Sequence, residues 1–111
     1  MDNKFYVSYE AARLLKEKGY DGDAEYAYHE NGNFSLWGRN VNEIDYLYAA
    51  PTKSEAIDWL DSNGKIIEVL QDYRGLWFYV IKESCVGEDD VYFPTRLEAE
   101  EAAIIKALEQ L

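Results

Sequence analysis

The most apolar stretch of the chain runs from Leu76 to Ile81, and it contains three aromatic and two β-branched residues. A run this short and this rich in strand-forming residues predicts a strand that is buried on both faces and central in a sheet. Residues 65–71 form a second strand-like segment, and the turn-forming residues 72–75 separate the two. The pattern therefore predicts a β-hairpin in the second half of the chain.

Three amphipathic segments, each opened by a capping residue, predict helices. Ser8 caps the first, over residues 8–18, and Gly19 ends it. Thr52 opens the second with Glu55 three residues later, a capping box, and Asn63-Gly64 stops it. Thr95 opens the third in the same way with Glu98. The apolar stripe of the third helix consists of Leu97, Ile104, Leu108 and Leu111.

A further hairpin is predicted around Asn31-Gly32, between strand-like residues 24–29 and 34–37. Residues 46–48 can form a short third strand. The fold class that follows is α+β, in the order helix, hairpin, helix, hairpin, helix. We expect one domain over residues 1–111, with a mostly antiparallel sheet and the helices packed on it.

Two segments of the chain are near copies of each other. Residues 50–56 match residues 93–99 around a shared Pro-Thr-x-x-Glu-Ala pattern, and the same offset aligns the two hairpins without a gap. One interpretation is an internal duplication of a ββα unit, over about residues 24–64 and 65–111. The other is that a common helix opening arose twice.

The alignment of the hairpins predicts which side chains face outward. Residues on one side of the strands, namely Phe34, Leu36, Trp77 and Tyr79, should face the core. The alternate positions then form an apolar outer stripe and a candidate interaction surface, made of Trp37, Phe78 and Val80. The first helix, a second copy of the chain or a partner protein could cover it.

The charge of the chain narrows the classes of partner. It has 22 acidic and 11 basic side chains and a net charge of −11. Binding to a nucleic-acid backbone relies on clustered cations, so this balance disfavours nucleic acid. The sequence shows no secretory signal pattern and no apolar run long enough to span a membrane. With a single cysteine, Cys85, these features predict a cytoplasmic protein.

Candidate chemistry is sparse. His29 and Cys85 are the only residues of their types, and no third group is placed to orient them as a nucleophile and base. They cannot form a usual zinc site, and the chain has no glycine-rich phosphate loop. We therefore predict no catalytic, cofactor-binding or metal site, and no enzyme.

Several segments of the chain resemble a known family. They are residues 5–10 and 14–21, the segment Ala50-Pro51-Thr52 with Ala56 and Trp59, and the closing Thr-x-x-Glu-Ala helix. Together they resemble a family of short uncharacterised proteins from Bacteroidetes genomes and their phages. The likeness spans nearly the whole chain and departs at residues 38–45 and 84–90. It implies a small accessory protein of phage or mobile-element origin, and it implies no activity.

Three hypotheses about function follow. The leading one is a non-enzymatic protein-interaction module, acting with an unknown protein partner or by self-association. The second is an acidic decoy that imitates nucleic acid and inhibits a DNA-binding protein. The third is a small-ligand binding domain with a tyrosine-lined pocket.

Overall fold

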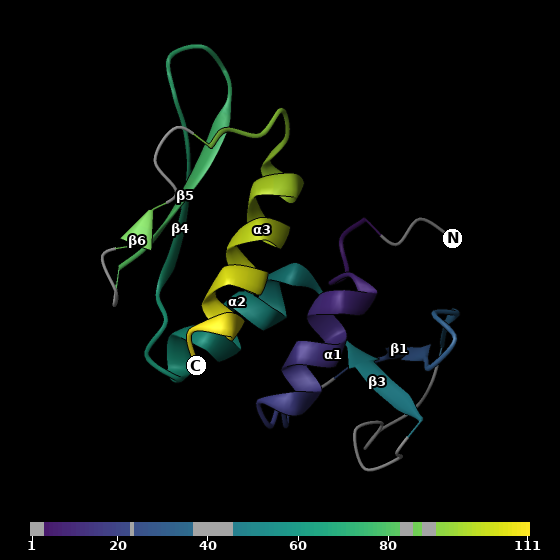
Figure 1. Ribbon diagram of the computed structural model, residues 1–111. Helices are drawn as coiled ribbons and strands as arrows, with labels where there is room; N and C mark the ends of the chain where they lie inside the picture. Colours follow the sequence, from purple (N-terminus) through teal and green to yellow (C-terminus); the bar gives the residue numbers. More distant parts are fainter. Residues whose placement is uncertain (1–3, 23, 37–45, 83–85, 88–90) are drawn as a thin grey trace.

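The computed structural model describes residues 4–22, 24–36, 46–82, 86–87 and 91–111 (Figure 1). It is an α+β structure whose sheets are antiparallel, as the sequence predicted. In chain order the elements are α1 (Tyr9–Glu17), β1 (Tyr26–His29), β2 (Phe34–Leu36), β3 (Leu47–Ala50), α2 (Lys53–Ser62), β4 (Ile67–Gln71), β5 (Trp77–Ile81), β6 (Val86–Gly87) and α3 (Arg96–Glu109).

The strands in the described part of the chain form two small sheets, so the expectation of one sheet was wrong. The first sheet has the order β2-β1-β3 and the second has the order β4-β5-β6. Helix α3 packs on β4 and β5, while α1 packs on β3, and both α1 and α2 pack on α3. The helices therefore lie between the two sheets, and Figure 1 shows α3 between α1 and the second sheet.

The two halves of the chain differ in topology. In the first sheet the third strand, β3, pairs with β1, which is the first strand of its hairpin. In the second sheet β6 pairs with β5, which is the second strand of its hairpin. A duplicated ββα unit would have kept one pairing, so the structure does not support the predicted duplication or a plain helix–hairpin order. In both copies the threonine of the shared Pro-Thr-x-x-Glu-Ala pattern caps a helix, as expected if a common helix opening arose twice.

The predicted starts of the three helices are confirmed by their capping contacts. The Ser8 side chain accepts a hydrogen bond from the amide of Ala11, and Thr52 and Glu55 form the predicted capping box. The Thr95 side chain accepts from the amide of Glu98. Gly19 follows α1 with a φ of 89°, a left-handed conformation that glycine adopts without the strain other residues incur.

The core lies where the helices meet the inner faces of the two sheets. Alanines line much of it, and their small side chains allow close approach of helix and sheet; on α3 they are Ala99, Ala103 and Ala107. Phe34 packs against this core and stacks on Tyr26, with ring centroids 5.0 Å apart. Leu36 was expected to face the core but is 67% exposed. It is the last residue of the edge strand β2, which has a neighbouring strand on one side only.

Candidate interaction surface

The second sheet has one face against the helices and one face away from them. Tyr79 and Ile81 of β5 are buried, and Ile67 and Val69 of β4 pack against the same core. β5 is central in its sheet, as predicted. The prediction that it is buried on both faces was wrong, because Phe78 and Val80 keep part of their surface exposed.

The other face of this sheet carries the residues that alternate with the buried ones. Leu70 lies directly opposite Phe78 across β4 and β5, and Glu68 lies opposite Val80. Neither Phe78 nor Val80 belongs to the core or to the side chains that pack against it. We call this surface the outer face. Its apolar members are Ile66, Leu70, Phe78, Val80 and Tyr92, of which Ile66, Leu70 and Tyr92 are 41–42% exposed.

Tyr92 joins the outer face from a segment distant in sequence. The backbone of the neighbouring Phe93 forms two hydrogen bonds of 2.8 Å with Trp77, which fixes this segment beside β5. The ring of Tyr92 then meets that of Phe78 edge-on, with the centroids 6.0 Å apart. The guanidinium of Arg74 lies 4.5 Å from the centroid of the Tyr92 ring, a cation–π contact. The outer face therefore has an aromatic end near the hairpin turn.

Two ion pairs neutralise the carboxylates at this surface. The Lys82 Nζ atom lies 2.8 Å from Oε1 of Glu68, and the Arg74 Nη2 atom lies 2.8 Å from Oδ2 of Asp72. Desolvation raises the pKa of Asp72, but hydrogen bonds from the Arg74 side chain and from the amides of Leu76 and Arg74 lower it by more. The net effect is a lowered pKa, so Asp72 stays ionised and holds the turn.

The structure brings together only part of the predicted interaction surface. Phe78 and Val80 share the outer face, as the alternation of strand residues predicted. Trp37 lies outside the described residues, and the residue before it, Leu36, belongs to the first sheet. Ile66, Leu70 and Tyr92 also belong to the outer face and were not predicted from the sequence. Alternation along residues 66–70 was a signal that could have found two of them, whereas the position of Tyr92 depends on tertiary contacts.

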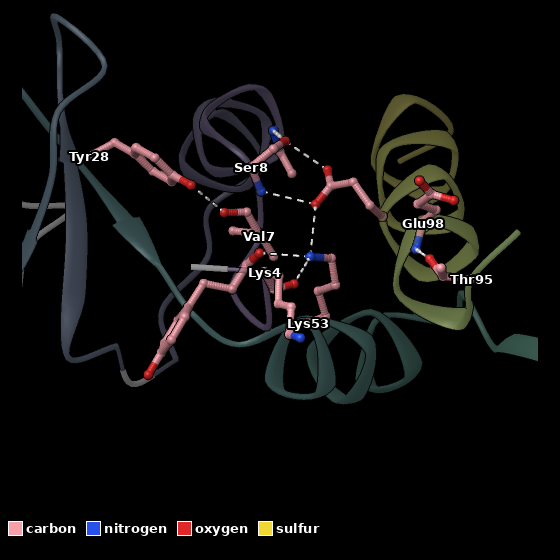
Figure 2. A network of polar contacts seen from close by, with 10 residues as sticks. Lys4, Val7, Ser8, Tyr28, Lys53, Thr95 and Glu98 are labelled. Carbon is pink, nitrogen blue, oxygen red and sulfur yellow. Dashed lines mark hydrogen bonds and ion pairs between the residues drawn. The ribbon is translucent and has the colours of Figure 1, made fainter. Parts of the chain in front are cut away.

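A buried cation links the N-terminal segment to two helices (Figure 2). Lys53, at the start of α2, is 7% exposed and donates hydrogen bonds to the backbone carbonyls of Lys4 and Tyr6, the latter at 2.9 Å. Glu101 of α3 lies 3.9 Å from its Nζ atom. Burial lowers the pKa of Lys53, and the nearby Glu101 opposes that shift. Two of these partners are main-chain carbonyls, so the arrangement fastens the chain rather than exposing a reactive amine.

The same network holds the start of α1. The Ser8 amide and hydroxyl donate to the two carboxylate oxygens of Glu101 at 2.9 and 2.7 Å. The Tyr28 hydroxyl donates to the Val7 carbonyl at 2.8 Å, which ties the first sheet to the same segment (Figure 2). The network thus joins α1, which packs on the first sheet, to α3, which packs on the second.

A groove of about 350 Å³ lies beside α1. Charged side chains of both signs dominate its lining, and only Leu14 and Tyr48 contribute large apolar surfaces. Lys16 donates to the Leu47 carbonyl at 2.8 Å and also lies over the Tyr48 ring. The lining residues are Glu10, Arg13, Leu14, Lys16, Glu17, Tyr48 and Glu109.

The two residues considered for nucleophilic chemistry are not brought together by any described contact. His29 lies beside Tyr46, with ring centroids 5.4 Å apart, and Cys85 is outside the described residues. Among the residues that the structure describes, no group of three His, Cys, Asp or Glu side chains is placed to hold a metal ion. Within the same ranges, none of the helices has the length and apolarity that crossing a membrane requires.

Comparisons with known proteins add no identification. No family model matches the chain, and neither the curated proteins nor the solved structures include a match.

Proposed function

We propose that this protein is a non-enzymatic protein-interaction module that binds through the outer face of its second sheet. The observation that carries the proposal is the pair Leu70 and Phe78, which lie side by side on that face and away from the core. Contiguous exposed apolar surface is costly in water, and where it occurs it commonly marks a contact site.

The composition of the outer face fits protein rather than nucleic acid as the partner. Most of the outer side chains are aromatic or aliphatic, and the charged residues among and beside them are paired, Glu68 with Lys82 and Asp72 with Arg74. Protein interfaces also combine apolar and polar side chains, and tyrosine and arginine are enriched in them. Tyr92 and Arg74, in contact at one end of the face, supply both residue types.

The cellular compartment and the origin of the protein are inferred from the sequence. A single cysteine and the resemblance to phage-associated proteins favour a small accessory protein in the cytoplasm. The acidic-decoy alternative needs carboxylates arrayed without cations over one surface. Around α1, Glu10 and Glu17 instead share their surface with Arg13 and Lys16, which favours the interaction module.

Affinity capture with matched variants tests the proposal. Phe78→Lys places a charge among the apolar side chains of the outer face, whereas Leu36→Lys places one at an exposed leucine position of the other sheet. We expect proteins that the tagged wild-type chain retains to be lost with Phe78→Lys and kept with Leu36→Lys. Equal retention by both variants, with both folded as judged by circular dichroism, would refute the proposal.

A further inference from the structure

Strand β4 forms an edge of the second sheet, and its backbone groups divide between two sides. The Lys82 amide donates to the Ile66 carbonyl and the Asp72 amide to the Leu76 carbonyl, both at 2.8 Å. Residues of an antiparallel strand alternate in the side to which they bond. Ile67, Val69 and Gln71 therefore direct their amides and carbonyls away from β5. Among the described residues, no main-chain hydrogen bond uses these three amides.

Among the described residues, β4 carries no lysine, no proline and no β-bulge, and its one charged side chain is Glu68. Natural sheets shield exposed edges with lysine or proline on the edge strand, with a β-bulge or with a covering segment. β4 has the sequence Ile-Glu-Val-Leu-Gln, and its register with β5 continues without a bulge over all five residues. The far side of β5, in contrast, is occupied by β6 and by Phe93.

The charge around this hairpin permits the approach of a second copy. The chain has a net charge of −11, so two copies repel each other overall. Residues 65–82 are an exception, with the cations Lys65, Arg74 and Lys82 and only two carboxylates. Both of those carboxylates already have a cation 2.8 Å away. The hairpin is thus a place where two copies can meet without strong repulsion.

We propose that β4 pairs antiparallel with β4 of a second copy, about a twofold axis at Val69. This register uses every residue of the strand, because Val69 lies opposite the partner's Val69 and Ile67 lies opposite the partner's Gln71. The outward amides and carbonyls of both strands are then bonded. The pairing joins two three-stranded sheets into one of six strands, and it makes the two outer faces continuous. The role of this dimer rests on the proposed function, because the widened outer face is the surface that would bind a partner protein.

Light scattering on a size-exclusion column, over a range of concentrations, tests the pairing. We expect the wild-type mass to rise toward twice the chain mass of 12.9 kDa. Gln71→Pro should give the mass of a single chain at every concentration, because it removes an outward amide that the pairing needs. The fold should persist, because β5 does not use this amide and edge strands tolerate proline at such positions. Gln71→Ala is the matched control. It loses the side-chain bond to the Gly75 carbonyl, 3.1 Å long, keeps the amide and should still dimerise.

A second pair of variants keeps the test valid if the proline variant does not fold. Lys82→Glu removes the cation beside Glu68 and should weaken dimerisation at least tenfold, while the loss of an exposed ion pair leaves the fold in place. Arg13→Glu makes the same change of charge on α1 and should not weaken it. A wild-type mass of one chain at every concentration would overturn the pairing. So would dimers that are insensitive to both Gln71→Pro and Lys82→Glu.

The two proposals fail in different ways. A monomeric wild-type chain that still retains a protein in a manner dependent on Phe78 would remove the β4 pairing and leave the interaction module standing. Dimers that depend on the Gln71 amide, together with captured proteins that Phe78→Lys does not affect, would support the β4 pairing and remove the interaction module.

Discussion

Leu70 and Phe78 lie directly opposite each other on β4 and β5, on the face of the second sheet that the core does not use. This position predicts a contrast in stability within one strand. Phe78→Ala should lower the free energy of unfolding by about 1 kcal/mol, because the ring is already partly in water. Ile81→Ala, at a fully buried site, should cost roughly 2–5 kcal/mol. Urea unfolding of the two variants checks the contrast, and equal losses would place Phe78 in the core.

The buried cation Lys53 makes a second prediction. Lys53→Met leaves the carbonyls of Lys4 and Tyr6 without their donor, and we expect a loss of about 1–3 kcal/mol in the free energy of unfolding. Lys65→Met, at a partly exposed lysine, should change stability by less than about 0.5 kcal/mol. Chemical denaturation of both variants is the measurement. A Lys53 variant as stable as the Lys65 variant would show that the network does not fasten the N-terminal segment.

The helix caps should differ in strength. Ser8 accepts from the Ala11 amide and also donates to Glu101, so Ser8→Ala should cost roughly 2 kcal/mol. Thr95 caps α3 at an exposed site, and Thr95→Ala should cost about 1 kcal/mol. Thermal unfolding of the two variants compares them directly. A larger shift of Tm for Thr95→Ala would contradict the role given to the bond between Ser8 and Glu101.

The hairpin turn should respond to acid through Asp72. Its pKa is lowered in the folded chain, so the unfolded chain binds more protons between the folded value and the ordinary value of about 3.9. The stability that Asp72 contributes is therefore present above about pH 4 and is lost as the pH falls through the folded value. Asp72→Asn should reduce this dependence. Carboxyl titration by NMR would reveal an error if Asp72 titrates at or above the ordinary value.

Local signals in the sequence determined most of the elements but not their arrangement. Ser8, Thr52 and Thr95 mark the helix starts because a capping hydroxyl acts within three residues. Asn31-Gly32 likewise marks a hairpin turn, and Gly32 has a φ of 92°. Which strand joins which is decided by packing on the helices, and alternation cannot reveal it. This is why one sheet was expected where two exist.

For the candidate surface too, the sequence predicted the local features and not the tertiary ones. Alternation along Trp77–Ile81 placed Phe78 and Val80 on one side of β5, because successive side chains point to opposite faces. The contribution of Tyr92 depends on the bridge between Phe93 and Trp77, 16 residues apart in the chain, which no local pattern specifies. The open edge of β4 could be recognised only once the order of the second sheet was known.

Amide hydrogen exchange, measured by NMR on dilute and concentrated protein, tests most directly whether the second sheet is where the chain associates. We expect protection to rise with concentration at the outward amides of Ile67 and Val69. The amides of Glu68 and Leu70, already bonded to β5, and those of β1 and β2 should exchange as before. Protection that rises in the first sheet instead, or nowhere in residues 65–82, would contradict the account.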